Sequence, residues 1–244
     1  MGQTRLDQAL ARQGMVATRS QAESYIKLGK VKVNGKLVSK PGALVGDKDQ
    51  LELVQDEQYV SRAALKLASV TDKLGLNFTE ATVLDVGSST GGFTYFALRH
   101  GAKKVIAVDV GTEQLHPSLR LDSRVELMEK TDIRQVVQLP HKIDIVLADL
   151  SFISLRKILP TIAKLSNFST QIIVMAKPQF EASITEVSRG VIKNDSIRRK
   201  VLKDLEIWLK SYFIVEAKAD SEVKGAKGNL ERFYRLKKLA QTKH

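Results

Sequence analysis

The stretch LDVGSSTGGF, residues 84–93, decides the fold of this chain. Its apolar half predicts a buried strand over 82–87, its three glycines predict a tight turn, and a helix is expected over 92–101. A strand that runs through a glycine-rich turn into a helix is typical of a doubly wound α/β sheet. Glycines let the backbone approach a ligand closely, and the helix N-terminus favours negative charge there. The sequence therefore predicts a ligand site at this turn.

Strand and helix patterns continue to the end of the chain. Repeated strand–helix units predict a mostly parallel, Rossmann-like sheet. The last two strands are separated by a loop without a helix, so they are expected to form an antiparallel hairpin at the sheet edge. The predicted strands are 82–87, 104–111, 124–130, 143–151, 171–177, 213–221 and 231–239, and the predicted helices are 61–76, 92–101, 155–165 and 196–212.

Acidic residues around the turn narrow the choice of ligand. Asp109 ends the second strand 22 residues after Gly87, where a carboxylate typically holds ribose hydroxyls, as in sites for NAD or S-adenosylmethionine. Asp85 would repel a pyrophosphate but favour the ammonium and sulfonium of S-adenosylmethionine. The loop is Gly-x-x-x-Gly-Gly, and no Gly-Lys-Ser/Thr phosphate loop is present. We therefore expect S-adenosylmethionine as the ligand. The expected fold is the Rossmann-like sheet of a class I methyltransferase.

Asp132 follows the third strand and has two readings. It is placed to meet the adenine amino group, and it is equally suited to cap a helix. The sequence leaves both readings open. The full set of predicted cofactor-binding residues is Asp85, Gly87, Ser88, Ser89, Thr90, Gly91, Gly92, Phe93, Asp109 and Asp132.

Two further strands each deliver an ionisable residue to the same edge of the sheet. Asp149 follows one apolar run in VLADLSF, and Lys177 follows another in IIVMAKPQFE. An unpaired buried lysine is costly, so a structural ion pair between the strand ends is one reading. Catalysis is the other, because ligands bind beyond the carboxyl ends of such strands. A ribose 2′-hydroxyl is a poor acid that needs a base or a cationic field to become nucleophilic, and a lysine can supply either.

Other methylation chemistries lack their usual residues here. Methylation of nucleobase amino groups commonly uses an Asn/Asp-Pro-Pro-Tyr/Phe loop after the fourth strand, where this chain reads ADLSF. Carbon methylation of bases usually uses cysteine, and the chain has none. The absence of cysteine also excludes disulfides and Cys-based zinc sites. The four histidines are scattered, so no metal is expected.

Residues 1–54 show a different pattern from the rest. Short helices are expected over 4–14 and 18–30, then an Asn-Gly hairpin over 31–38 and a strand over 49–54. Residues 5–38, RLDQALARQGMVATRSQAESYIKLGKVKVNGKLV, resemble the S4 RNA-binding domain. The resemblance implies RNA contacts by basic residues of the helices, although each alone could be a solvated side chain. These residues are Arg5, Arg19, Lys27 and Lys30.

The positive charge of the chain is concentrated at its two ends. The formal net charge is +12 over 244 residues. Residues 1–40 hold 8 Lys/Arg against 2 Asp/Glu, residues 41–188 hold 16 against 18, and residues 189–244 hold 15 against 7. This segregation favours a polyanionic partner over simple solubility. No apolar run is long enough for a membrane span and no secretory signal is evident, so a cytoplasmic protein is expected.

Six motifs, in order along almost the whole chain, resemble the TlyA family. They are YVSRAALKL, VLDVGSSTGGF, DVGTEQL, ADLSFISL, KPQFE and GNLERF. This family comprises S4-domain ribosomal RNA 2′-O-methyltransferases that are often labelled hemolysins, with an FtsJ-like catalytic half. The resemblance implies a Lys-Asp-Lys-Glu tetrad of Lys66, Asp149, Lys177 and Glu231. On their own, Lys66 and Glu231 read as an exposed helix lysine and a solvent-facing strand residue.

The combined prediction is an S4-like RNA-binding domain over 1–54, a linker over 55–60 and a methyltransferase domain over 61–244. Lys177 is expected to activate the hydroxyl. The expected substrate is ribosomal RNA or a ribosomal subunit, and the family resemblance points to cytidine. Asp149 orients this lysine, while the other two tetrad residues tune its charge and position the ribose. Candidate phosphate contacts are Arg62, Arg189, Arg198 and Arg199. A non-catalytic ribosome assembly factor and a membrane-active hemolysin are the rival functions.

Overall fold

The computed structural model describes residues 3–16, 19–27, 29–54, 61–188, 190–192, 194–225 and 228–239. The predicted linker at 55–60 therefore lies outside the described residues. The elements of the N-terminal module are β1 (Thr4–Arg5), α1 (Leu6–Arg12), α2 (Arg19–Lys27), β2 (Val31–Val33), β3 (Lys36–Leu37), β4 (Leu44–Val45) and β5 (Leu51–Leu53).

The N-terminal module has the expected two helices and hairpin. Asn34 and Gly35 both adopt positive φ in the turn between β2 and β3, as an Asn-Gly hairpin requires. β5 adds to β2 on the other side. The first helix is shorter than predicted because residues 4 and 5 pair with β4, a strand that the sequence pattern did not reveal.

One seven-stranded sheet organises the rest of the described chain. Its order is β11-β12-β10-β9-β6-β7-β8. The five adjacent strands β10, β9, β6, β7 and β8 run parallel to one another, whereas β12 is antiparallel to both β10 and β11. The prediction of a mostly parallel sheet with an antiparallel final strand is confirmed. The strands are β6 (Thr82–Val86), β7 (Lys104–Val108), β8 (Val125–Met128), β9 (Ile145–Ala148), β10 (Gln171–Ala176), β11 (Phe213–Asp220) and β12 (Arg232–Lys238).

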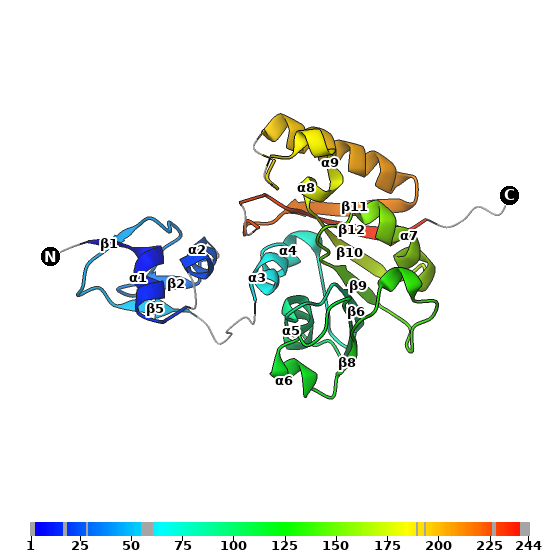
Figure 1. Cartoon of the computed structure of the whole chain (residues 1–244). Helices are drawn as coiled ribbons and strands as arrows, with labels where there is room; N and C mark the ends of the chain where they lie inside the picture. The colour runs from blue at the N-terminus through cyan, green and yellow to red at the C-terminus, as the bar shows by residue number, and fades with distance from the viewer. Residues whose placement is uncertain are drawn as a thin grey trace.

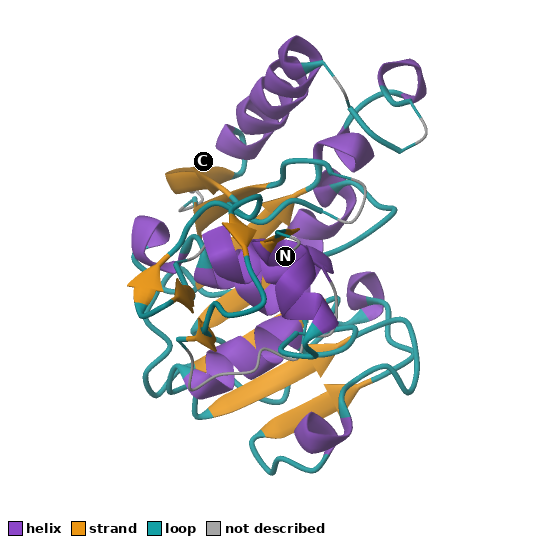
Figure 2. Cartoon of the chain, turned by 90° about the vertical axis from the view of Figure 1, so that its left-hand side faces the viewer, coloured by secondary structure: helices purple, strands orange, loops and turns teal. Residues whose placement is uncertain are grey.

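Helices cover both faces of this sheet (Figures 1 and 2). Neighbouring residues of β6 show the alternation, since Val83 packs on one face with α3 and α5 while Leu84 packs on the other with α7 and α9. The helices are α3 (Arg62–Ala68), α4 (Thr71–Leu74), α5 (Gly92–Arg99), α6 (Pro117–Arg120), α7 (Leu155–Leu165), α8 (Pro178–Glu181) and α9 (Asp195–Lys210), with the 3₁₀ turns η1 (Ile133–Gln135) and η2 (Ile184–Glu186).

The prediction of one continuous helix over 61–76 is wrong, because the helix is interrupted between α3 and α4. The Ser69 hydroxyl donates to the carbonyl of Lys66 at 2.7 Å, and the Thr71 hydroxyl donates to the carbonyl of Leu67 at 2.9 Å. Such side-chain bonds compete with the backbone ladder of a helix. The break ends α3 just after Lys66, so this lysine lies on the last turn of a short helix.

Candidate active site

Lys177 and Asp149 meet at the carboxyl edge of the sheet. Each directly follows a strand, and those strands, β10 and β9, are parallel neighbours. The Lys177 Nζ lies 2.6 Å from the Asp149 Oδ1, and the two side chains are 10% and 15% exposed. Lys177 also donates to the Ser151 hydroxyl at 2.7 Å. The strand pattern alone predicted this meeting.

Lys66 and Glu231 form a second pair at the same edge. The Lys66 Nζ lies 2.6 Å from the Glu231 Oε2, and these side chains are 10% and 3% exposed. The readings of Lys66 and Glu231 as solvent-facing residues are therefore wrong. Gly225 makes room for the carboxylate, because a Cβ at that position would lie 2.7 Å from the Glu231 Oε1. All four residues of the implied tetrad thus come together as two ion pairs.

Three adjoining cavities surround these pairs. The first, of about 270 Å³, holds the glycine turn together with Lys66, Asp149 and Lys177. The second, of about 540 Å³, shares Gly87, Ser89, Asp149 and Ser151 with the first and is lined mainly by apolar groups. The third, of about 260 Å³, shares both lysines with the first and includes Glu231. Lys66 and Lys177 therefore stand between the first cavity and the third.

Asp85 lies at the floor of the first cavity and is almost wholly buried. Its Oδ2 accepts a hydrogen bond from the Thr94 hydroxyl at 2.7 Å, whereas its Oδ1 has no hydrogen-bond partner among the residues that the structure describes. Burial raises the pKa of Asp85 to about 7; the bond from Thr94 opposes this shift, and the charges of Asp149 and Asp109 add to it. A buried acceptor of this kind favours a cationic ligand group.

The glycine turn brings backbone and cavity together. Gly87 has φ 83°, and a Cβ there would lie 2.6 Å from the carbonyl oxygen of Asp149, so only glycine fits. Gly92 packs α5 against the start of α3, where a Cβ would meet Ser61. Gly91 does not line the first cavity and instead lies against two leucines, Leu115 and Leu119. The other predicted residues of the turn, which do line it, are Ser88, Ser89, Thr90 and Phe93.

Asp109 and Asp132 both line the second cavity. The Asp109 carboxylate accepts backbone hydrogen bonds from Ser89 at 2.8 Å and from Gly111 at 2.7 Å, which fixes its orientation. Asp132 caps η1 by accepting from the Arg134 backbone, and it also binds the Arg134 guanidinium. These bonds hold the pKa of Asp132 below its usual range. The structure thus shows Asp132 as a cap, and the same residue also lines the second cavity.

The predicted RNA contacts fall into two groups. Arg5 and Arg19 both bind Asp7, and Lys27 and Lys30 lie at and beyond the end of α2. Arg62 lines the first and third cavities, next to the lysine pairs.

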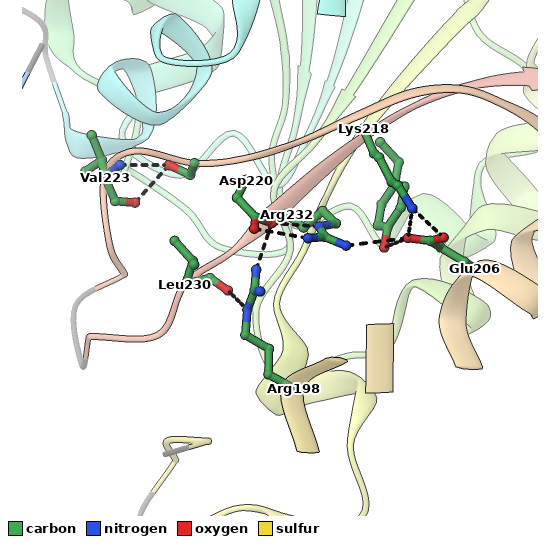
Figure 3. A network of polar contacts seen from close by, with 9 residues as sticks. Arg198, Glu206, Lys218, Asp220, Val223, Leu230 and Arg232 are labelled. Carbon is green, nitrogen blue, oxygen red and sulfur yellow. Dashed lines mark hydrogen bonds and ion pairs between the residues drawn. The ribbon is translucent and has the colours of Figure 1, made fainter. Parts of the chain in front are cut away.

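Of the three candidate phosphate contacts on the C-terminal side, the structure describes Arg198 and Arg199. The prediction for Arg198 is wrong: its guanidinium is turned inward, where it pairs with Asp220 at 2.7 Å and donates to the carbonyl of Leu230 at 3.1 Å (Figure 3). Arg199, on the same helix, is exposed. Arg189 lies outside the described residues.

Several residues of the site were not anticipated from the sequence. Phe152 is 91% exposed, has φ 64°, borders the second and third cavities, and lies with its ring centroid 5.2 Å from that of Phe180. Asn229 borders the third cavity and binds the backbone of Gly190 and Ile192. Both lie inside motifs that carry the family resemblance, Phe152 in ADLSFISL and Asn229 in GNLERF, but nothing in their spacing distinguished them from ordinary loop residues.

The described residues show neither a metal-binding cluster nor a membrane-spanning helix. Within the described ranges, no three His, Asp or Glu side chains gather as a group that could hold a metal ion. In the part of the chain that the structure describes, no helix is both long and apolar enough to cross a membrane.

Comparison with known proteins places this site among relatives. A family model described as FtsJ-like methyltransferase matches residues 59–238, and one described as S4 domain matches residues 4–51. Hemolysin A of Brachyspira hyodysenteriae is 39% identical over 232 residues, covering 93% of this chain and 97% of the relative. A Mycobacterium tuberculosis protein named 16S/23S rRNA (cytidine-2′-O)-methyltransferase TlyA is 38% identical, covering 78% and 73%. A solved Streptococcus thermophilus structure, named as a hemolysin, is 36% identical with a TM-score of 0.71, covering 98% and 89%.

Proposed function

Since the chain belongs to the FtsJ-like methyltransferase family and to its TlyA branch, we propose that it transfers a methyl group from S-adenosylmethionine to a ribose 2′-hydroxyl of ribosomal RNA. Membership confirms the predicted family and the predicted enzyme class. The observation that carries the choice of reaction is the Lys177–Asp149 pair, which stands where the first cavity meets the third.

The first two cavities suit the two ends of S-adenosylmethionine. Asp109 and Asp132 lie beside apolar walls that include Ile133 and Ile153, a combination that fits a ribose and an adenine. The unpartnered oxygen of Asp85 fits the cationic methionine end in the first cavity. When bound there, S-adenosylmethionine supplies an electrophilic methyl group whose transfer needs no metal.

The third cavity would take the ribose of the target nucleotide. Lys177, in its unprotonated form, would accept the hydroxyl proton as the oxygen–carbon bond forms and the bond between the methyl group and the sulfur of the donor breaks, leaving a neutral thioether; Asp149 and Ser151 fix the position of this lysine. Glu231 holds Lys66 beside the same hydroxyl. The positive charge of Lys66 stabilises the ribose oxygen as that oxygen loses its proton. Each lysine has its own carboxylate, Asp149 for Lys177 and Glu231 for Lys66.

Phe152 would support the base of that nucleotide. Its ring is exposed at the mouth of the third cavity and is backed by Phe180. Proteins commonly hold an unstacked RNA base on an aromatic ring. Cytidine is the nucleoside that the names of two relatives carry, and we propose it here as well. A ribosomal substrate would also place the enzyme in the cytoplasm.

The test is methyl transfer from labelled S-adenosylmethionine to ribosomal subunits from a strain that lacks this protein. We expect label on a ribose 2′-oxygen with the wild type, and a loss of roughly 10²–10⁴-fold with Lys177→Ala. Lys157→Ala, an exposed lysine on α7, is the matched control and should be as active as the wild type.

Each other result has a definite meaning. Equal labelling by wild type and Lys177→Ala would keep the enzyme and remove Lys177 from the reaction. A wild-type protein that binds RNA and cofactor but labels neither subunit would favour the assembly-factor function instead.

A further inference from the structure

A buried carboxylate in the N-terminal module joins two arginines. Asp7, in the first turn of α1, is fully buried. Its Oδ1 accepts from the Arg5 Nε at 3.1 Å, and its Oδ2 accepts from the Arg5 Nη2 at 2.8 Å and the Arg19 Nε at 3.1 Å. Burial acts to raise the pKa of Asp7, but the bonds from both arginines outweigh it and lower the pKa. The carboxylate is therefore ionised at neutral pH.

The two guanidinium groups remain accessible although their anion is not. The side chain of Arg5 is 43% exposed and that of Arg19 is 49% exposed. Arg5 also lies close over Gly42, where a Cβ would be 3.0 Å from its Nη1. Arg19 additionally has Glu23 at 3.7 Å, beyond hydrogen-bonding distance. The buried Asp7 carboxylate thus holds the two exposed guanidinium groups, those of Arg5 and Arg19, next to each other.

We propose that Asp7 is a positioning residue that holds Arg5 and Arg19 as a preformed two-guanidinium clamp for the backbone phosphates of structured RNA. This inference rests on the proposed function, because it takes the substrate to be RNA. A guanidinium binds phosphate through a planar fork of N–H donors, so its orientation matters as well as its charge. Fixing that orientation before binding lowers the conformational entropy that binding must otherwise remove.

A purely structural ion pair is the competing explanation, and the sign of a charge change separates the two. Asp7→Asn raises the net charge of the chain by one. If only the summed charge attracts RNA, affinity will stay the same or rise. If Asp7 orients the arginines, affinity will fall despite the added charge. No other acid of the module is described with two arginine partners, so the effect should be specific to this position.

The experiment measures binding of the full-length protein to ribosomal subunits from the deletion strain, over a series of salt concentrations. We expect Asp7→Asn to weaken binding by roughly 5–20-fold and to raise the KM for subunits without changing kcat. Glu52→Gln is the control, because it makes the same charge change at an exposed residue of β5. It should bind as tightly as the wild type or slightly more tightly.

Thermal melting of each variant shows whether the module still folds. Should Asp7→Asn fail to fold, Arg19→Lys decides the question, since it keeps the charge but removes the planar fork; binding unchanged by that variant would overturn the clamp. A folded Asp7→Asn that binds as tightly as Glu52→Gln would overturn it too. Wild-type protein that binds subunits but transfers no methyl group would leave the clamp intact and refute the methyltransferase proposal.

Discussion

Three lysine–carboxylate pairs in this protein have the same separation but very different surroundings. Lys177–Asp149 and Lys66–Glu231 lie at the adjoining cavities, and Lys73–Glu222 lies on the surface; each pair is 2.6 Å apart. The side chains of the surface pair are 53% and 42% exposed. Water screens that pair, whereas the cavity pairs act in a less polar environment where charge interactions are stronger. Burial, and not distance, should therefore determine what each pair contributes.

The largest effect is expected from breaking a cavity pair. Glu231→Ala leaves the Lys66 ammonium buried without its carboxylate, which typically costs about 3–5 kcal/mol. We expect a clear fall in the free energy of unfolding, measured by urea denaturation, and at least ~10²-fold less methyl transfer. Lys66→Met with Glu231→Leu would remove both charges; it should recover much of the stability and none of the activity. If Glu231→Ala left the free energy of unfolding unchanged, burial would not determine how much each ion pair contributes to stability.

A second buried carboxylate, Glu181, tests whether the cavity pairs depend on their supporting loops. It accepts from the Ser154 hydroxyl and the Leu155 backbone, both at 2.7 Å, and so ties the end of α8, which follows Lys177, to the start of α7. Glu181→Ala removes this cap, and we expect a loss of about 1–2 kcal/mol together with a lower kcat. Glu181→Gln keeps an acceptor and should retain most of both. A kcat that does not change in Glu181→Ala would restrict its role to stability.

The two ion pairs at the cavities differ in how far the sequence could predict them. Asp149 and Lys177 could be predicted to meet because each follows an apolar strand and parallel strand ends share an edge. The burial of Lys66 could not be predicted, since its partner lies 165 positions later in the chain. The inward turn of Arg198 depends on Asp220 in the same way. Local pattern located the strands and their ends, while contacts between distant segments decided which charges became buried.

Asp85 extends the comparison to a buried carboxylate that forms no ion pair within the part of the chain that the structure describes. Its pKa is raised to about 7, mainly by burial, so the folded protein keeps a proton that the unfolded chain releases near its ordinary value of 3.8. Its contribution to stability is therefore present at low pH and is lost as pH rises through about 7. We expect Asp85→Asn to abolish this decline. The measurement is the melting temperature of the wild type and of Asp85→Asn between pH 3.8 and about 7. If the Asp85 side chain were not responsible, the melting temperatures of the two proteins would change in parallel with pH.

Binding of the cofactor should show the opposite trend for the same reason. A cationic ligand favours ionised Asp85, so wild-type affinity for S-adenosylmethionine should increase between about pH 6 and pH 7.5. Titration calorimetry of Asp85→Asn should give a weaker affinity that varies less with pH. An identical pH dependence in both proteins would show that the cationic end binds elsewhere.

The smallest effect is expected from the surface pair, which has the same 2.6 Å separation as the other two. Lys73→Ala removes an ion pair whose partners are both well solvated, so we expect a change within about 0.5 kcal/mol in the free energy of unfolding. Methyl transfer should be unchanged, because Lys73 is not among the residues that line the described cavities. Raising the salt concentration should remove what little stabilisation the pair gives, while the Lys66–Glu231 pair should respond much less. Equal salt sensitivity in the two pairs would mean that water reaches the cavity lysines as freely as it reaches the surface, and their role in activating a hydroxyl would then need another source of the required field.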